Sequence, residues 1–393
     1  MAETLDSSLR LSGQEASSAA TAGGEQKATY VIPWSRPDIG SNEIDEVVKV
    51  MRSGWASQGA VTREFELMLA KYCGVNYAIV VNSGSSALLC SFMAHGAKPR
   101  DHVLIPDYTH IATANVPKLL GCRVSLVDID RDTFNVDYLA LERAVRRRRP
   151  KFVVAVDVAG LPNDMHFLST LAQRYEFTLI EDAAESIGAE YNHQRVGSHG
   201  HTATLSFHAA KQLTTIEGGA ILTNDPRIAN RCRMIRNHGE TARFKYFSRL
   251  VGMNFRTTDL QSAIGIAQLK KLDDSLSRRD QLARIYGEKL SGLFTFQRIP
   301  SYATRHAHMM FLAVARSRRI RDKVDRHLQR QGIETRIPWP PIHKQVQFKN
   351  AKTGFPRSSS LYERAISLPL YNTMRDSDAE KVVSEVLAGT ALH

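Results

Sequence analysis

Lys211 and Asp182 are the two residues whose types and spacing most directly suggest catalysis. Lys211 closes the segment Ser-Phe-His-Ala-Ala-Lys, and Asp182 opens an Asp-Ala-Ala-Glu turn about one strand, loop and strand earlier. A lysine amine can form a Schiff base with an aldehyde and then move protons, and a buried aspartate can keep a pyridinium nitrogen charged. Either residue alone is typical of a surface lysine or a helix cap, but together they suit pyridoxal phosphate.

Short apolar runs lead up to both groups. Residues 178–181 end at Asp182, and residues 204–207 end just before the lysine loop. Both runs are rich in β-branched and apolar residues, which predicts strands. In open α/β sheets, ligands bind outside the carboxyl ends of the strands. We therefore expect Lys211 and Asp182 to lie close together at that edge.

A further segment is typical of a phosphate site. Residues 78–81 are predicted to form a buried strand, Asn-Ser-Gly-Ser-Ser at 82–86 a tight turn, and residues 87–93 the opening of an apolar helix. Free N–H groups and small hydroxyls at a helix N-terminus suit a phosphate dianion, although such turns are also common for capping alone. Ser206 can add a further hydroxyl to the same phosphate.

Taken with other segments, these motifs resemble the pyridoxal-phosphate-dependent sugar-nucleotide aminotransferases of the DegT/StrS family, which have the aspartate-aminotransferase-like fold of type I. The resemblance runs from about residue 32 to about residue 386 and is carried by many segments in one order, which is more specific than any single motif. These segments are residues 32–37, 53–59, 84–88, 109–115, 181–185, 206–211, 236–239, 252–256, 268–273 and 368–371.

The resemblance implies roles for individual residues. Lys211 is implied to hold the cofactor as an internal aldimine and to act as general acid and base, while Asp182 pairs with the pyridine nitrogen. The phosphate is implied to lie at the turn of Gly84, with the hydroxyls of Ser85, Ser86 and Ser206 around it. Asn254 is implied to reach this phosphate from the partner subunit of a homodimer with shared active sites.

Two positions depart from the usual family pattern. Glu185 stands where most members have Gln, which contacts the phenolic oxygen of the cofactor, and some perosamine synthase-like members share the Glu. His110 stands where the family usually has Phe, Tyr or Trp to stack on the cofactor ring. An imidazole can also stack, over a smaller area.

Composition supports a globular enzyme and argues against several other classes. The 393 residues are 43% hydrophobic and 23% charged, which allows a large α/β core with a smaller second domain. The sequence has no run of eighteen apolar residues and no basic start followed by an apolar stretch, so we expect a cytoplasmic protein without a membrane span or signal peptide. The four cysteines lack metal-ligand spacing and are interpreted as reduced thiols, so no metal is expected.

The formal net charge of +12 raises the possibility of a nucleic-acid partner. The strongest basic clusters are residues 146–149 and 316–323. Neither contains the interleaved aromatics of a nucleic-acid module, so we interpret them as a solvated helix end and a solvated loop. A positive field can also draw in a dianionic nucleotide sugar and an acidic amino donor.

Three regions are expected along the chain. Residues 1–28 are rich in small and polar residues and are predicted to be a disordered tail. Residues 29–275 alternate strand and helix signals, which predicts a large α/β cofactor-binding domain with a mostly parallel sheet and helices on both faces. Residues 276–393 are predicted to form a smaller α+β domain that closes over the site.

The resemblance implies an aminotransferase that moves the amino group of L-glutamate to a nucleotide-linked keto-deoxysugar, in amino-sugar biosynthesis for a surface polysaccharide or a glycosylated metabolite. A 4-keto-6-deoxyhexose is the expected acceptor, and Glu185 favours a GDP-perosamine synthase-like role. Arg336 and His343, in a proline-rich segment, are candidates for binding the sugar nucleotide. Two alternatives stay open: a sugar dehydratase relative, against which the retained Lys211 argues, and a non-catalytic regulator or polyanion-binding protein on the same scaffold.

Overall fold

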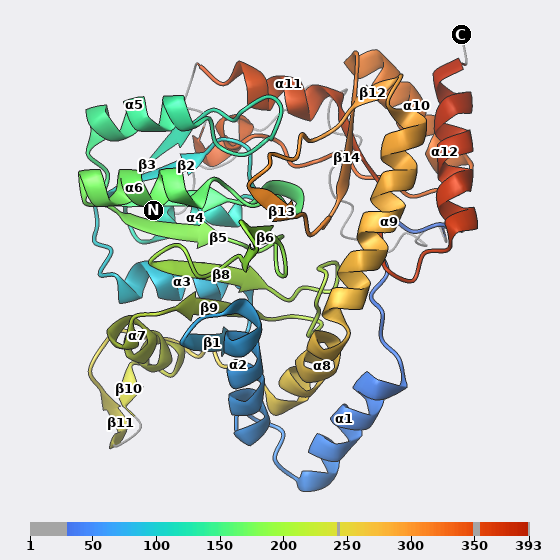
Figure 1. Ribbon diagram of the computed structural model, residues 1–393. Coiled ribbons are helices and arrows are strands. Elements are labelled where there is room, and N and C mark those ends of the chain that lie inside the picture. Colours follow the sequence, from blue (N-terminus) through green and yellow to red (C-terminus); the bar gives the residue numbers. More distant parts are fainter. Residues whose placement is uncertain (1–29, 242–243, 349–353, 392–393) are drawn as a thin grey trace, which may run out of the picture.

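A seven-stranded sheet forms the centre of the structure, a computed structural model that describes residues 30–241, 244–348 and 354–391 (Figure 1). The tail predicted at residues 1–28 lies outside the described residues. In spatial order the strands are β1 (Tyr77–Val81), β9 (Gly219–Thr223), β8 (Thr202–Ser206), β5 (Thr178–Asp182), β4 (Phe152–Val156), β2 (His102–Pro106) and β3 (Arg123–Val127). Only β9 runs opposite to the other six strands, so the expected mostly parallel sheet is confirmed.

Helices cover both faces of this sheet because side chains along each strand alternate between the faces. In β4, Val154 packs in the same core as Phe92, whereas Val153 packs on the opposite side with Leu168. One face is covered by α3 (Gly84–Ala94), α4 (Ala112–Leu119) and α7 (Pro226–Arg236). The other is covered by α2 (Ala60–Cys73), α5 (Tyr138–Arg148), α6 (Met165–Tyr175) and α8 (Asp259–Lys270).

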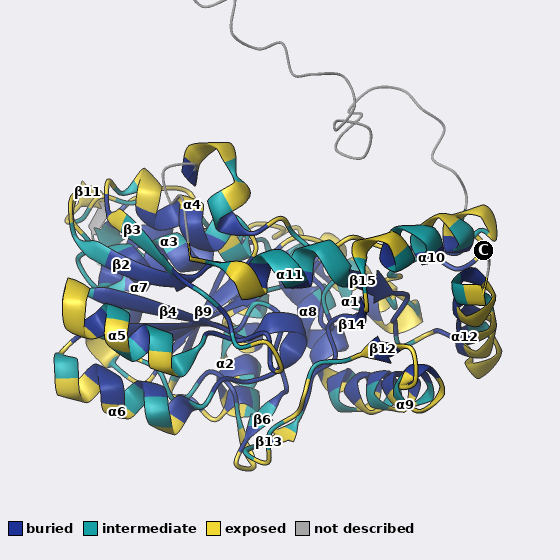
Figure 2. Cartoon of the chain, turned by 90° about the horizontal axis from the view of Figure 1, so that it is seen from above, coloured by how far each residue is buried: buried dark blue, intermediate teal, exposed yellow. Residues whose placement is uncertain are grey.

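The C-terminal region has a core of its own, beside the large sheet. Its antiparallel strands β12 (Phe294–Thr295), β14 (Phe311–Ala315) and β15 (Ala365–Leu368) pack with α9 (Leu272–Leu290), α10 (Arg318–Arg330) and α12 (Asp376–Ala391). Figure 2 shows the buried strands lying between the more exposed helices of this region. The boundary expected at residue 275 falls inside α9, so one continuous helix joins the two regions. Ile32, near the start of the described chain, also packs into this C-terminal core.

Smaller elements complete the described chain. They are α1 (Ser41–Ser53), α11 (Pro356–Arg364), the hairpin of β10 (Glu240–Thr241) and β11 (Phe244–Ser248), a small sheet of β6 (Glu190–Tyr191), β7 (Gln194–Arg195) and β13 (Ala303–Arg305), and 3-10 turns at Val158–Gly160, Ile342–Lys344 and Val346–Phe348. Within the described ranges, no helix is long and apolar enough to cross a membrane and no cluster of residues is suited to a metal ion. All four cysteines are buried and unpaired.

Of the two interpretations of the basic clusters, the structure confirms one and contradicts the other. Residues 146–149 end α5, with Arg149 as its left-handed C-cap, as the helix-end interpretation predicted. The interpretation of residues 316–323 as a loop is wrong, because α10 begins at Arg318 and buries Arg321 and Val324 on its inner face. Ser317 caps this helix, and its hydroxyl accepts the N–H of Ile320. The helix was not predicted because most residues of α10 are charged, and only a narrow apolar stripe packs against the core.

Candidate active site

The predicted catalytic residues meet in one cleft of about 490 Å³ at the carboxyl edge of the large sheet. Asp182 ends β5, Ser206 ends β8, and the turn before α3 follows β1. Apart from Asn254, which is expected from the partner subunit, ten residues are predicted to form the site. Eight of them line this cleft. These are Gly84, Ser85, His110, Asp182, Glu185, Ser206, Lys211 and Arg336.

Lys211 is held by Glu185. The Lys211 Nζ lies 3.2 Å from Glu185 Oε1, and both side chains are largely buried. The second oxygen, Glu185 Oε2, accepts the backbone N–H of Ala159 at 2.9 Å. Ala159 has a left-handed backbone with φ of 58°, which aims its N–H at the carboxylate. The carboxylate of Glu185 is therefore fixed on one side and leaves its other oxygen for the amine.

Asp182 is buried and accepts a hydrogen bond from a threonine that the sequence-based analysis did not single out. Thr113 Oγ1 donates to Asp182 Oδ2 at 2.7 Å, and Thr109 Oγ1 lies 2.9 Å from Thr113 Oγ1. Burial raises the pKa of Asp182, and the hydrogen bond from Thr113 opposes that rise. Thr109 lies in the bend before α4 and Thr113 in its first turn, so no helical spacing in the sequence signalled this contact.

The turn before α3 offers hydroxyls and N–H groups to the cleft. Its serines have different roles, because some line the cleft and one is turned toward the helix cap. Ser83 is the N-cap of α3, and its Oγ accepts the Ser86 N–H at 3.1 Å and lies 2.9 Å from Ser86 Oγ. Ser86 is thereby turned into the cap and does not line the cleft, whereas Ser83, Gly84, Ser85 and Ser206 do. Ser83 lies in the predicted turn, but the sequence gives no signal that separates its role from those of Ser85 and Ser86.

Two glycines allow this turn to approach the neighbouring strands. A Cβ at Gly84 would lie 3.0 Å from Ser206 Cβ, and a Cβ at Gly219 would lie 2.5 Å from the Ser83 carbonyl oxygen. Any side chain at either position would push the turn away from β8 and β9. The close approach brings the Ser206 hydroxyl to the N-terminus of α3, the place where anions bind to helices.

His110 forms one side of the cleft. Its Nδ1 accepts the N–H of Ala112 at 3.3 Å, so a neutral ring carries its proton on Nε2. Loss of hydration and the nearby Lys211 charge lower the pKa of His110, which favours this neutral form. The ring meets Trp339 edge to face, with centroids 6.0 Å apart.

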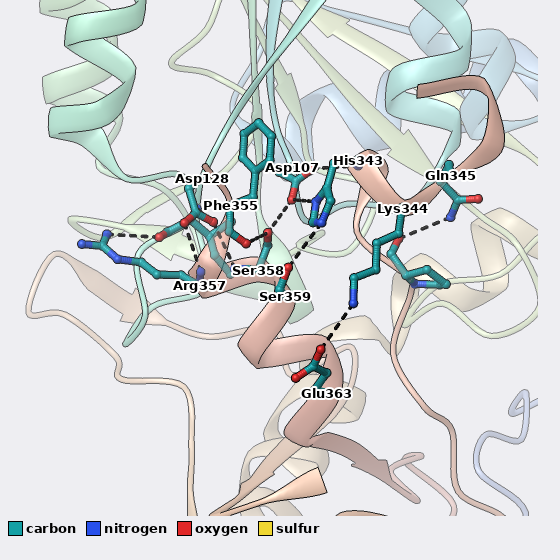
Figure 3. A network of polar contacts seen from close by, with 12 residues as sticks. Asp107, Asp128, His343, Lys344, Gln345, Phe355, Arg357, Ser358, Ser359 and Glu363 are labelled. Atoms are coloured by element: carbon teal, nitrogen blue, oxygen red, sulfur yellow. Dashed lines mark hydrogen bonds and ion pairs between the residues drawn. The ribbon is translucent and has the colours of Figure 1, made fainter. Parts of the chain in front are cut away.

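Arg336 and Trp339 form the wall of the cleft contributed by the C-terminal region. The Arg336 guanidinium pairs with Glu334 and lies 5.9 Å from the Trp34 ring centroid. His343 does not line the cleft: its Nδ1 lies 2.6 Å from Asp107 Oδ2, in the network of Figure 3. The expectation that His343 binds the sugar directly is corrected, because its ring is committed to that carboxylate.

Asn254 also lies outside the cleft of its own chain. It is exposed, and its Oδ1 accepts the backbone N–H of Arg256 at 3.3 Å. An isolated bridge joins it to Asn237 at the end of α7.

The cleft has the groups that pyridoxal phosphate requires. Lys211 offers an amine for the aldehyde, Asp182 a buried carboxylate for the pyridine nitrogen, and the Gly84 turn with Ser206 a cradle for the phosphate. The absence of a Cβ at Gly84 is itself part of that cradle.

Comparison with known proteins agrees with this geometry. The model of the DegT/DnrJ/EryC1/StrS aminotransferase family matches residues 37–387. The chain is 35% identical to the GDP-perosamine synthase of Caulobacter vibrioides over 90% of this chain and 96% of that protein. Among solved structures, it is similar to PseC of Helicobacter pylori, an aminotransferase of pseudoaminic acid biosynthesis, with a TM-score of 0.86, 26% identity and coverage of 91% and 99%. It is also similar to the PLP form of the sugar aminotransferase Spr1654 from Streptococcus pneumoniae, with a TM-score of 0.86, 25% identity and coverage of 91% and 98%.

Proposed function

The chain belongs to the DegT/DnrJ/EryC1/StrS aminotransferase family and is a PLP-dependent sugar aminotransferase, and we propose that it transfers the amino group of L-glutamate to a nucleotide-linked 4-keto-6-deoxyhexose. The observation that carries this proposal is the meeting of Lys211, Glu185 and Asp182 in one cleft. Its product would serve amino-sugar biosynthesis for a surface polysaccharide or a glycosylated metabolite.

Lys211 is the proposed acid and base of both half-reactions. When bound, pyridoxal phosphate supplies an electron sink for the carbon that loses or gains a proton. The Lys211 Nζ moves that proton, and Glu185 holds the amine at 3.2 Å so that it does not swing into solvent. Proton transfer needs this geometry as much as a suitable pKa, because the reacting atoms must lie within hydrogen-bond reach.

Asp182 is the proposed partner of the pyridine nitrogen. Thr113 donates to Oδ2, which leaves Oδ1 for the cofactor, apart from a long contact of 3.4 Å from the Ala184 N–H. A hydrogen bond to the charged form favours ionisation of a carboxylate. The Thr113 hydroxyl therefore favours the ionised form of Asp182 and opposes the burial that raises its pKa.

The proposed sugar nucleotide lies against the wall of Arg336 and Trp339. Arg336 offers a planar set of donors suited to a diphosphate, and Trp339 offers an apolar face to a deoxysugar. A GDP-linked sugar is our first choice, supported by the similarity to GDP-perosamine synthase and by Glu185. The retained Lys211 disfavours a dehydratase, and the complete set of cofactor groups disfavours a catalytically silent regulator.

We further propose that the enzyme acts in the cytoplasm as a homodimer in which Asn254 completes the phosphate site of the partner. Support comes from the exposure of large apolar side chains next to Asn254, namely Val251 at 81% and Met253 at 58%. Exposed apolar groups of this size gather where a second chain covers them. The four buried, unpaired cysteines suit a reducing compartment.

The shared site has a direct test in mixed dimers. A Lys211→Ala subunit and an Asn254→Ala subunit are each expected to be inactive alone or nearly so. After subunit exchange, one of the two sites in the mixed dimer has both residues, and activity should return in part. No recovery, with exchange demonstrated by mass spectrometry, would show that each site is built from one chain.

The substrate has a separate test. The purified enzyme is offered GDP-, dTDP- and UDP-linked 4-keto sugars with L-glutamate, and amino-sugar formation is followed by mass spectrometry. We expect turnover of a nucleotide keto-sugar and rejection of pyruvate and oxaloacetate as acceptors by orders of magnitude, because unfilled polar groups of a sugar site oppose small keto acids. Efficient use of either keto acid would overturn the proposed substrate class.

A further inference from the structure

His343 lies outside the cleft but is bound firmly to the large region. Its Nδ1 donates to Asp107 Oδ2 at 2.6 Å, and its backbone N–H donates to Asp107 Oδ1 at 2.9 Å. Asp107 is fully buried, and the His343 ring stacks on Phe355 with centroids 5.2 Å apart. Figure 3 shows the two residues facing each other at the centre of this network. We call the Asp107–His343 contact the clip.

Asp107 ties several distant segments together at the end of β2. Its carbonyl oxygen accepts the Ile342 N–H at 2.8 Å, and its own N–H donates to Val127 at the end of β3. Ser358, in α11, donates its hydroxyl to Asp107 Oδ2. Because Asp107 leads directly into residues 108–113, the clip fastens the C-terminal segment to the loop after β2, which carries His110, and to the start of α4, which carries Thr113.

The clip holds one end of a short segment whose other end is also fixed. Arg336 forms a backbone pair with Ser367 of β15, with hydrogen bonds of 3.2 and 2.8 Å. Between the two anchors lie three prolines, at 338, 340 and 341, which restrict the backbone. The Trp339 ring is thereby set against Tyr108 and His110, at centroid distances of 5.9 and 6.0 Å.

Ser359, His343 and Asp107 are the residue types of a hydrolytic triad, and Ser359 Oγ lies 3.3 Å from His343 Nε2. Two N–H groups at the start of α11, those of Arg357 and Ser358, donate instead to Asp128 at 3.1 and 3.0 Å. They are therefore not available to stabilise an oxyanion. The geometry favours a structural use of the imidazole.

We propose that His343 is a positioning residue for the amino acceptor. Through Asp107 it holds residues 336–343 so that Arg336 and Trp339 face the cleft, and it sets the affinity for the acceptor without touching it. Lys211 and Asp182 lie on the sheet side of the cleft and are held by Glu185 and Thr113, not by His343. The identity of the acceptor rests on the proposed function, whereas the clip itself does not.

The kinetic test separates the two half-reactions in the complete enzyme. In His343→Asn, the amide nitrogen can take the place of Nδ1 and donate to Asp107; in His343→Ala, the donor is absent. We expect the alanine variant to raise the sugar KM about tenfold or more while glutamate-driven conversion of the cofactor stays within about twofold, and the asparagine variant to restore most of the affinity. Ser359→Ala removes only the outer contact of the ring and serves as the control.

Hydrogen exchange gives a readout that needs no substrate. The amides of Ile342 and His343 donate to Asp107, so His343→Ala should speed exchange in residues 336–343 and leave residues 206–213 unchanged. His343→Asn should restore protection. If the alanine variant does not fold, His343→Gln replaces it, because its longer side chain places the amide nitrogen away from the Nδ1 position.

Several results would overturn the proposal. Unchanged exchange in the variant without the donor would show that the clip does not hold the segment. Equal losses in both half-reactions, or an asparagine variant as impaired as alanine, would show that the imidazole acts by another route. If the unaltered enzyme turns over no nucleotide keto-sugar, the proposed function fails, and exchange alone then decides whether the clip holds the wall.

Discussion

The two walls of the cleft are built in different ways. The sheet wall carries Lys211 and Asp182, whose side chains are buried and held by contacts of 3.2 and 2.7 Å from within the large region. The C-terminal wall carries Arg336, whose side chain is 61% exposed, and is held through His343, which lies 236 positions from its partner Asp107. In the proposed function, the chemistry lies on the buried wall, whereas the choice of acceptor lies on the wall that is more exposed and held from a distance.

The largest expected effect is on the sheet wall. Lys211→Ala removes the amine that moves the proton, so we expect both half-reactions to fall by about a thousandfold or more. The visible absorption that the cofactor gives in the unaltered enzyme should change at the same time. Rapid-mixing spectroscopy with glutamate, and with the keto-sugar, measures each half separately. An alanine variant that keeps a normal rate in either half would contradict a shared acid and base.

A smaller loss is expected when the support of Asp182 is removed. Thr113→Val keeps the volume but lacks the hydroxyl, and hydrogen bonds to charged groups contribute about 1.5–3 kcal/mol. We therefore expect both half-reactions to slow by about tenfold to a hundredfold, together with weaker retention of the cofactor in equilibrium dialysis. Thr113→Ser retains the donor and should recover most of both properties. A loss confined to the sugar half would place Thr113 in acceptor binding instead.

Arg336→Ala probes the opposite wall. We expect the sugar KM to rise by about tenfold, because a planar donor set for the diphosphate is lost, while the glutamate half-reaction stays nearly intact. Steady-state kinetics with each substrate varied in turn provides the measurement. The two walls would lose their proposed division of labour if glutamate conversion fell as far as sugar conversion.

The smallest effect on turnover is expected at Asp157, a buried carboxyl behind the sheet wall. Burial, together with repulsion from Asp182, raises the pKa of Asp157 to about 6. The folded state then holds a proton that the unfolded chain has lost, so the stability contributed by this group falls as pH rises from about 4 to about 6. Asp157→Asn cannot lose a proton, so its stability relative to the unaltered protein should rise across that window.

Urea unfolding of both cofactor-free proteins at a series of pH values measures this difference. The comparison between variants is needed because other carboxyls, such as Asp130 and Asp273, have a lowered pKa and change stability in the opposite direction. A difference that does not vary with pH would show that Asp157 is ionised in the folded protein throughout. Turnover at neutral pH is expected to change by less than about twofold.

The sheet wall is easier to predict from the sequence than the C-terminal wall for a physical reason. Lys211, Asp182 and Ser206 follow short strands, and the carboxyl ends of parallel strands meet at one edge whatever the details of packing. The role of Ser86 was harder to foresee, because a serine in such a turn can face the ligand or the cap, and only the side-chain rotamer decides. The antiparallel β9 gave no separate signal, since its apolar residues are also typical of a parallel buried strand.

The C-terminal wall depends on contacts that no local pattern contains. His343 and Asp107 are each unremarkable in their own segments, and they meet only because the turn at Ile342–Lys344 packs against the end of β2. The helix α10 was missed because its charged residues outnumber the few apolar ones on its inner face. Long-range pairing of this kind sets the acceptor wall, and it becomes visible only in the folded chain.

The most direct test of the account is to reduce the unaltered enzyme with borohydride and map the cofactor by peptide mass spectrometry. The account predicts that the cofactor becomes fixed to Lys211, in the peptide that contains residues 206–212, because this is the lysine in the cleft that faces Asp182 and the phosphate turn. Addition of glutamate before reduction should prevent the labelling, since the donor amine takes the place of Lys211. Attachment to a different lysine would contradict the assignment of the active site.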